Sequence, residues 1–407
     1  MASPAQQRHV VIACFLGWTL DAFDFFIMIF ALGAIAHSFG TGITSVTWAI
    51  TLTLAMRAVG ALIFGQLADR FGRRSILIAN VICFSLLEFA SGFAPTLAAF
   101  IVMRALFGIA MGGEWGVGAS LTMESIPASW RGTVSGILQS GYSFGYLLAA
   151  ILYGVAFPLV GWRGMFMLGA LPGLLVLYIR ASVPESPDWL LRRGRSTSSS
   201  ILAAAARRPW LFVYAILVMT AFNLFSHSTQ DLYPSAFLRG QHHFSVREVA
   251  TVAVIYNIGA IIGCLSAGAL SQRLGRRRTM ILCATAAILV IPLWAFASSP
   301  VWLGLGAFIM QFMVQGAFGV VPAHLNEMSP PEVRGTFPGF TYQLGNLFAA
   351  ANATIQAMIA ARMGHDYSAA LAMTCGFGAV AIIVLIGLGR EARHARMGAE
   401  AATAGAE

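Results

Sequence analysis

The chain of 407 residues contains no lysine, and only 10% of its residues are charged, far below the roughly 25% of soluble proteins. The missing lysine excludes Schiff-base chemistry and a phosphate-binding P-loop. HExxH and Cys/His clusters are absent too, so we predict no enzyme, no metal site and no bound cofactor. The cysteines lie singly in apolar segments, which argues against a disulfide framework: Cys14, Cys83, Cys264, Cys283 and Cys375.

What the sequence does contain is apolar residues, at 58%, with a mean hydropathy of +0.77. This composition predicts an all-α, polytopic membrane protein whose first partner is the lipid bilayer. A span needs about 20 mainly apolar residues. We place twelve: 10–34, 46–67, 76–93, 97–122, 133–156, 163–180, 210–235, 249–271, 279–297, 301–323, 336–360 and 369–389. The first leads through a short connector into the second, so we expect a retained helix.

The 25 basic residues are all arginines, and they stand mostly in the short connectors between spans. This pattern indicates membrane orientation and not nucleic-acid binding, because cytoplasmic connectors hold the excess of positive charge. We therefore predict a cell-membrane protein with both termini cytoplasmic. Arg163, Arg239, Arg247 and Arg362 then lie outside, and Arg57 and Arg104 lie within spans. The cytoplasmic arginines are Arg8, Arg70, Arg73, Arg74, Arg131, Arg180, Arg192, Arg193, Arg195, Arg207, Arg208, Arg273, Arg276, Arg277, Arg278, Arg334, Arg390, Arg393 and Arg396.

Two sequence motifs recur at one spacing. GQLADRFGRR at 65–74 returns as GALSQRLGRR at 268–277, and ESIPASWRGT at 124–133 returns as EMSPPEVRGT at 327–336, both offset by 203 residues. A polar, Ser-rich connector separates the copies, so we predict six-helix bundles at 1–180 and 210–390, a linker at 181–209 and a tail at 391–407. Duplicated halves are typical of secondary transporters, whose substrate site lies where the halves meet.

The G-x-L-A-D-R-x-G-R-R loop and the layout of six plus six spans resemble the major facilitator superfamily, over nearly the whole chain. The resemblance implies two pseudo-symmetric bundles and a cytoplasmic latch that favours an outward-open state. A short basic turn that only fixes topology is the alternative. Gln272 replaces Asp69 in the second copy, so we expect a weaker or different latch there. The expected latch residues are Gly65, Asp69, Arg70, Gly72, Arg73, Arg131, Arg273 and Arg334.

Polar residues interrupt the seventh span in NLFSHSTQDLYPS, at 223–235. Asn223, His227 and Asp231 fall at i, i+4 and i+8, so they share one helix face over roughly 12 Å. Such a stripe is costly in lipid and is expected to face a water-filled cavity. The alternative is a polar cluster that only joins neighbouring helices by hydrogen bonds. Pro234 is expected to loosen the helix near its outer end.

The same segment resembles a helix 7 signature, N-x-x-[ST]-H-x-[ST]-Q-D. It is typical of lactate and pyruvate proton symporters related to the yeast carboxylate permease, in the sialate:proton symporter branch. Ser235 stands where that signature usually has threonine. The matched residues are Asn223, Ser226, His227, Thr229, Gln230 and Asp231.

Acidic and basic residues also lie inside the first two spans. Asp21 and Asp24 are three residues apart on one helix face, and two carboxylates so close repel when both are ionised. One of them is therefore expected to hold a proton, as a proton-coupling site requires. The offset of 203 brings Asp24 into register with His227. Either aspartate could instead be a structural cap or an arginine partner.

Arg57 lies in the middle of the second span, where its planar guanidinium suits a carboxylate ligand. The resemblance implies that this arginine contacts the substrate carboxylate. The competing interpretation is a permanent ion pair with Asp21 or Asp24. Glu88, Arg104 and Glu114 are predicted to form a structural charge network within the first half.

Tyr142 and Gln343, in the fifth and eleventh spans, are expected to line the cavity, because the resemblance implies that these helices contribute polar and aromatic groups to it. The expected function is therefore proton-coupled symport of a small monocarboxylate such as lactate or pyruvate, by alternating access and as a monomeric transport unit. Arg57, Asn223, His227, Gln343 and Tyr142 would bind substrate, and Asp21, Asp24 or Asp231 would carry the proton.

The alternatives are a proton symporter for a larger acid, sialate or an aromatic acid, and, from another class, a transporter-like membrane sensor. The fifth span lacks the G-P-x-x-G-G pattern of drug antiporters, which argues against drug:proton antiport.

Overall fold

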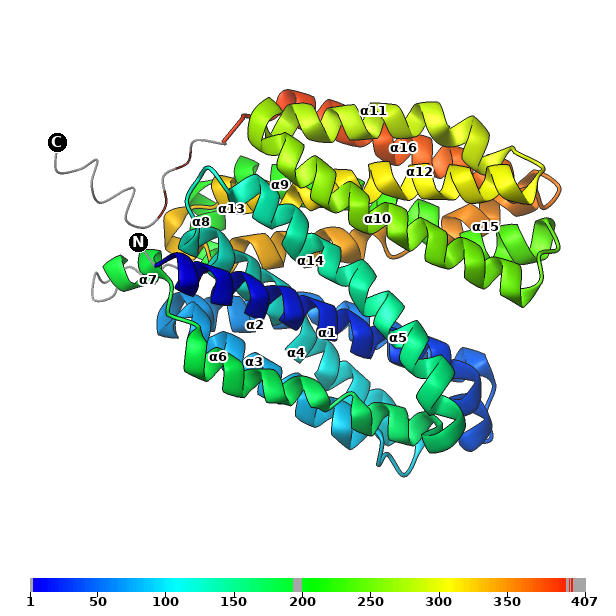
Figure 1. Cartoon of the computed structure of the whole chain (residues 1–407), viewed down its shortest axis with the longest axis horizontal. Coiled ribbons are helices and arrows are strands. Elements are labelled where there is room, and N and C mark those ends of the chain that lie inside the picture. Colours follow the sequence, from blue (N-terminus) through cyan, green and yellow to red (C-terminus); the bar gives the residue numbers. More distant parts are fainter. Residues whose placement is uncertain (1–2, 193–199, 393–394, 396, 398–407) are drawn as a thin grey trace.

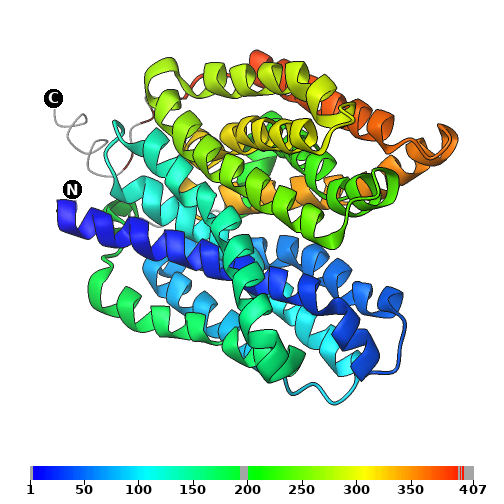
Figure 2. The same ribbon diagram turned by 45° about the vertical axis from the view of Figure 1, so that its right-hand side comes forward.

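The computed structural model describes residues 3–192, 200–392, 395 and 397, and the described chain is built of helices without a β-strand. Eleven of its helices are long and apolar enough to cross a membrane. They form two bundles, one from the first half of the chain and one from the second, with both termini at the same end (Figure 1). The turned view in Figure 2 shows the same two bundles packed side by side. The all-α, two-bundle architecture predicted from the sequence is confirmed.

The helices follow the apolar segments closely, as their bounds show. The first bundle contains α1 (Pro4–Ser38), α2 (Ile43–Phe71), α3 (Arg73–Ser91), α4 (Leu97–Ser125), α5 (Arg131–Leu168), η1 (Leu171–Leu174) and α6 (Leu175–Ser182). Two short helices follow between the bundles, α7 (Pro187–Arg192) and α8 (Ile201–Arg207). The second bundle contains α9 (Pro209–Gln230), η2 (Tyr233–Gln241), α10 (Val246–Leu274), α11 (Arg276–Ala295), α12 (Pro300–Gly319), α13 (Val321–Met328), η3 (Pro331–Val333), α14 (Phe337–Ala349), α15 (Asn352–Arg362) and α16 (Tyr367–Leu388).

The sixth predicted span, 163–180, is not one continuous helix. α5 continues to Leu168 through Gly161, whose φ of 62° is a conformation that glycine adopts without steric cost. The chain then passes through η1 into α6. The twelfth crossing is therefore assembled from the end of α5, η1 and α6, which explains why only eleven helical segments of the described chain are long enough to span.

Three spans of the second bundle also break. α9 ends at Gln230 and a π-helical segment, η2, begins at Tyr233, next to Pro234, where the sequence predicts a loosened helix. The tenth span divides into α12 and α13, and the eleventh into α14 and α15. These interruptions free backbone groups inside the bundle, a feature tolerated where protein surrounds the backbone.

The repeat persists in the packing. A methyl group on Gly60 would lie 1.8 Å from the Ile109 carbonyl oxygen, so α2 and α4 touch through their backbones. At positions 203 residues later, a methyl on Gly263 would lie 2.1 Å from the Phe312 carbonyl oxygen, joining α10 to α12 in the same way. Small residues at such crossings let helices approach closely in a membrane.

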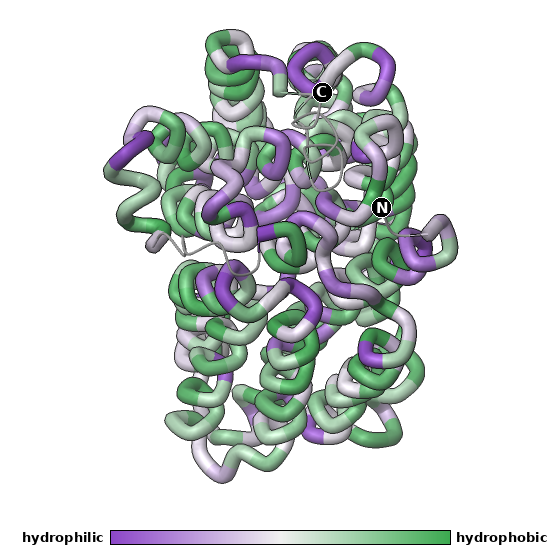
Figure 3. Tube along the Cα trace, turned by 90° about the vertical axis from the view of Figure 1, so that its left-hand side faces the viewer, coloured by the Kyte–Doolittle hydropathy of each residue, from purple (hydrophilic) through white to green (hydrophobic). Residues whose placement is uncertain are grey.

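Each bundle has its own apolar core, but the second core also takes in Trp18 and Trp115 from the first half. The halves are therefore joined through aromatic side chains as well as polar ones. Seen from the end that carries both termini, hydrophilic segments gather where the bundles meet, and apolar helices surround them (Figure 3). The predicted cytoplasmic arginines Arg193, Arg195, Arg393 and Arg396, and most of the predicted tail, lie outside the described residues.

Candidate functional site

Polar contacts between the halves gather at the end that carries the termini. Asp69, at the end of α2, accepts hydrogen bonds from the Gly335 and Thr336 amides at 2.8 and 3.1 Å and from the Thr336 hydroxyl at 2.6 Å. These donors precede α14, so the carboxylate caps a helix N-terminus of the other half. A negative charge is stabilising in that position.

Arg73 ties the same carboxylate into its own half. Its guanidinium lies 3.1 Å from Asp69 and makes a two-pronged contact with Glu124 of α4, at 3.1 and 3.2 Å. Arg276 and Glu327 repeat this contact 203 residues later, at 3.1 and 2.8 Å. We call Asp69, Arg73, Glu124, Asp188 and the 334–336 segment the end cluster.

Gln272 occupies the position equivalent to Asp69, and its neutral amide makes hydrogen bonds across the halves as the Asp69 carboxylate does. Its Oε1 accepts from the Gly132 amide at 2.9 Å, and its Nε2 donates to the Ala128 carbonyl at 2.9 Å. Gly132 is itself the 203-residue counterpart of Gly335. The second latch expected from the sequence is thus present, and it lacks the charge.

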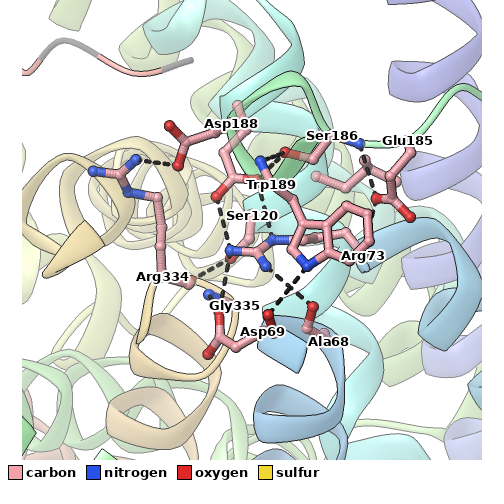
Figure 4. Close-up of polar contacts among 12 residues, drawn as sticks. Ala68, Asp69, Arg73, Ser120, Glu185, Ser186, Asp188, Trp189, Arg334 and Gly335 are labelled. Carbon is pink, nitrogen blue, oxygen red and sulfur yellow. Dashed lines mark hydrogen bonds and ion pairs between the residues drawn. The ribbon is translucent and has the colours of Figure 1, made fainter. Parts of the chain in front are cut away.

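The segment between the bundles completes the end cluster (Figure 4). Asp188 of α7 accepts from Arg334 of the second half at 2.8 Å, and the Trp189 indole donates to the Asp69 carbonyl at 3.1 Å. Glu185 accepts from the Arg73 and Arg74 amides at 2.8 and 3.1 Å, capping α3. α7 therefore binds both halves where they meet.

The other expected latch residues divide into two groups. Gly65 and Gly72 have no room for a side chain, because an added methyl would lie 2.7 Å from Thr336 and 2.3 Å from Glu185, respectively. Arg131 donates to the Met123 and Ala395 carbonyls at 3.2 and 2.7 Å. In contrast, Arg70 and Arg273 are exposed, and Arg70 packs over the Phe71 ring.

Farther along the bundles, His227 is held between two oxygens. Its Nδ1 lies 3.0 Å from Asp231 Oδ1, and its Nε2 lies 2.9 Å from Asn346 Oδ1 of α14. About 30% of the His227 side chain and 29% of Asp231 are accessible. A protonated imidazole can donate to both oxygens, whereas a neutral ring donates to only one. The arrangement therefore suits a ring that takes up and releases a proton.

This part of α9 lies within electrostatic reach of the first half. Asp231 and Arg57 both act electrostatically on Tyr142 of α5, and Arg57 acts on His227 as well. Asn223 is the exception on this face, because its amide donates to the Met219 carbonyl of its own helix at 2.8 Å.

The rest of the signature segment binds α12. Gln311 donates to the Thr229 hydroxyl at 2.9 Å, and Gln315 donates to the Ser226 hydroxyl at 3.2 Å. Gln230 also donates to Ser226, at 2.9 Å. For Ser226 and Thr229 the helix-joining alternative describes the structure, whereas the Gln230 contact stays within α9.

Arg57 on α2 is buried, with 4% of its surface exposed. Its guanidinium carbon lies 6.0 Å from the centre of the Trp18 ring. Among the described residues it forms no ion pair with Asp21 or Asp24, and its Nε has no hydrogen-bond partner. Both aspartates are fully buried, and their carboxylate oxygens also lack partners within the described chain. The permanent ion pair considered from the sequence is absent in this conformation.

The predicted charge network of the first half is only partly correct. Arg104 and Glu88 form a fully buried ion pair, and the arginine lies 3.8 Å from the centre of the Phe107 ring. Glu114 does not take part. It is fully buried, and no partner for either carboxylate oxygen occurs in the residues that the structure describes. The reason is geometric, since its carboxylate lies against α1 at Gly17, whose added methyl would be 2.4 Å from Oε1.

Aromatic rings bridge the halves next to Arg57. Trp115 of α4 stacks on Tyr342 of α14 with centres 4.4 Å apart, and Trp18 stacks on Tyr142 at 5.8 Å. Gln343, next to Tyr342, is buried with neither amide atom partnered in the described chain. Arginine, rings and an unpaired amide can together bind a carboxylate and cover its apolar part.

Several of these residues were not assigned to the site from the sequence. Glu124 lies in the motif at 124–133, but its partner Arg73 comes from another helix. Asp188 lies in PESPDWL, and no local pattern pairs it with Arg334. Glu114 carried a signal that could have placed it with the aspartates, because an intramembrane carboxylate is a functional candidate by default.

Comparison with known proteins agrees with this geometry. The Major Facilitator Superfamily model matches residues 14–230 and 228–405. The chain is 28% identical over 417 residues to the carboxylic acid transporter protein homolog of Saccharomyces cerevisiae, covering 93% of this chain and 67% of that protein. It is 28% identical over 385 residues to the sialic acid transporter NanX of Escherichia coli, covering 94% of each.

Among solved structures, the proton:xylose symporter XylE matches with a TM-score of 0.81 and 18% identity, covering 99% of this chain and 100% of that one, which shows a common fold. The family model spans nearly the whole sequence, in two copies that coincide with the repeat. The chain belongs to the major facilitator superfamily and is a multi-pass membrane transporter, not an enzyme.

Proposed function

We propose that the protein is a proton-coupled symporter of a small organic carboxylate, with monocarboxylates such as lactate and pyruvate as first candidates. One observation carries the proposal: Arg57 is buried between the halves, and within the described residues its guanidinium has no ion-pair partner and lies beside polar groups that also lack partners. A buried cation without a counter-ion is costly, so an anionic ligand that completes it would be bound strongly.

The side chains around Arg57 have distinct roles in this proposal. The substrate carboxylate binds the guanidinium, and Gln343 and Asn223 offer amide groups to its remaining oxygens. Tyr142 closes the pocket from α5. His227, bracketed by Asp231 and Asn346, binds substrate when its ring is protonated.

Coupling follows from charge. An anion carried alone through the low-dielectric interior is unfavourable, and so is a proton carried alone. Asp21, Asp24 and Asp231 are the proton-carrying candidates, and loading both ions leaves the site nearly neutral. The rocking step between outward and inward states is then easier.

We further propose that both termini are cytoplasmic, that the end cluster is the cytoplasmic gate and that one chain is the transport unit. The contacts of Asp69 with Gly335 and Thr336 hold that gate shut in this conformation. The conformation described here would then be one that is closed to the cytoplasm.

The test is uptake of labelled lactate into proteoliposomes at pH 6 outside and pH 7.5 inside, compared with equal pH. Arg57→Ala should reduce uptake at least about 10-fold, and Arg57→Lys should restore only part of it, because lysine lacks the two-pronged geometry. Arg70→Ala, an exposed arginine on the same helix, is the matched control. Uptake that ignores the pH gradient, or that survives Arg57→Ala, would refute the proposal.

The stacked rings favour a second candidate, a planar or aromatic carboxylate. Trp115 and Tyr342 come from opposite halves and could cover a flat apolar body when the halves part. Labelled nicotinate and benzoate in the same assay separate the candidates. If Tyr342→Ala lowers nicotinate uptake and spares lactate, the aromatic acid is favoured. A transporter-like sensor would give no substrate-dependent proton flux with any of these acids.

A further inference from the structure

Glu114 is a buried carboxylate for which the proposed binding arrangement has no use. It lies in the middle of α4, with none of its surface exposed and both oxygens without a hydrogen-bond partner in the described part of the chain. An ionised carboxylate in that environment would be strongly unfavourable, whereas a protonated one is tolerated. The side chain must therefore either hold a proton or wait for a counter-ion.

Its position is fixed by close packing on two sides. An added methyl on Gly17 of α1 would meet Glu114 Oε1 at 2.4 Å, so the carboxylate lies directly against that helix. Asp21 follows Gly17 by one turn, on the same face of α1. On α4, a methyl group added to Gly112 would lie 2.0 Å from the Arg57 carbonyl oxygen, so this face of α4 touches α2. Gly112 and Glu114 are two residues apart and point to different faces of α4, so the Glu114 carboxylate lies between α4 and α1, with Asp21 one turn beyond Gly17.

Glu114, Asp21 and Arg57 form a triad of two carboxylic acids and one guanidinium. Asp21 and Arg57 act electrostatically on Glu114, and Cys14 lies beside it on α1. On α3 the nearest acid, Glu88, is already paired with Arg104. From α5 and α14 the groups near by are the neutral Gln139, which accepts from the Trp115 indole at 3.1 Å, and the phenols of Tyr142 and Tyr342. Arg57 is therefore the only cation of the triad.

Two carboxylates against one guanidinium leave an excess negative charge if all three ionise. When a substrate anion binds Arg57, it neutralises the only positive charge of the triad. Both carboxylates are then stable only when they are protonated. Binding of the anion and binding of the proton must favour each other by the same factor. This linkage makes the triad a coupling device without any contact between Glu114 and the substrate.

We propose that Glu114 is a proton-coupling residue, which takes a proton from water on one carboxylate oxygen when substrate occupies Arg57 and releases it on the other side of the membrane. The proposal rests on the proposed symport function and adds Glu114, with Asp21, to its proton path. It departs from the structural role that the sequence suggests for this residue.

The experiment compares two transport modes of purified protein in proteoliposomes, with labelled lactate as the probe, or labelled nicotinate if the wild type prefers it. One mode is uptake driven by an acid-outside gradient, and the other is exchange of internal unlabelled for external labelled acid at equal pH. Glu114→Gln should lose gradient stimulation, to about onefold, and keep exchange within about 2-fold of wild type. Glu248→Gln, which alters an exposed capping carboxyl on α10, should change neither mode.

Gly17→Ala provides an independent test, because it displaces the Glu114 carboxylate without removing it. It should weaken gradient stimulation more than exchange. If Glu114→Gln stays gradient-driven, or loses exchange as fully as gradient uptake, the proposal is wrong. If Glu114→Gln does not fold, proton uptake on substrate binding is measured in detergent for wild type and Glu114→Asp, and an unchanged pH midpoint refutes the proposal. Loss of gradient stimulation in the wild type would instead refute the symport function itself.

Discussion

The strongest single test of the gate is Asp69→Asn. The Asp69 carboxylate accepts three hydrogen bonds from the start of the 334–336 segment and α14, across the halves, and its side chain is only 9% exposed. Charge-assisted hydrogen bonds are roughly twice as strong as neutral ones, which contribute about 1 kcal/mol each, and a charge at a helix N-terminus adds roughly 0.3–1 kcal/mol. An asparagine side chain still has an oxygen that accepts hydrogen bonds, but it carries no charge. Arg73 retains its ion pair with Glu124 in this variant.

We therefore expect Asp69→Asn to cost the closed gate about 1–3 kcal/mol, which changes the ratio of closed to open protein roughly 5- to 150-fold. Spin labels at Phe71 and Leu274, which are 51% and 41% exposed and are equivalent positions of the two halves, would report the separation across the gate. The exposed native Cys83 must first be removed.

The distance distribution of reconstituted Asp69→Asn should gain a long component that the wild type lacks. Asp366→Asn, which alters a helix-capping carboxylate before α16 at the other end of the bundle, is the control and should leave the distribution unchanged. An identical distribution in wild type and a folded Asp69→Asn protein would show that the cap does not hold the gate.

Two further predictions concern stability in detergent. Glu327→Gln should lower the melting temperature more than Glu124→Gln. Among the described residues Arg276, which faces Glu327, pairs with no second carboxylate, whereas Arg73 of the first half keeps Asp69; removing one partner of a buried pair costs about 3–5 kcal/mol. Equal losses would contradict the asymmetry. Gly263→Ala should destabilise by about 1–3 kcal/mol, since its methyl would enter the Phe312 carbonyl, while Gly304→Ala, with open space around it, should melt as wild type.

The fold could be predicted well from sequence because apolar length and a repeat at constant spacing are properties of the chain itself. The exceptions are the spans that break within their predicted bounds. In the sixth, hydropathy predicts one helix over 163–180, but α5 ends at Leu168 and the chain continues through η1 into α6.

The site could be predicted in outline only. His227 and Asp231 follow from helical periodicity, but periodicity cannot say that Ser226 and Thr229 turn to α12, because the neighbouring helix is chosen by tertiary packing. The role of Asp188 depends on where α7 docks. Glu114 was grouped with Glu88 and Arg104 on proximity in sequence, while the actual neighbour, Gly17, comes from another helix.

The two halves contact each other through two related but unequal sets of hydrogen bonds. In one set the Asp69 carboxylate accepts from the start of a helix in the other half, and in the related set the neutral Gln272 amide accepts from the corresponding position. If the protein opens at this end, the uncharged contacts of Gln272 should separate first, and the charged contacts of Asp69 should be the last to break. Duplication of one sequence would then have produced two closures of different strength, of which the charged one sets the stability of the closed state.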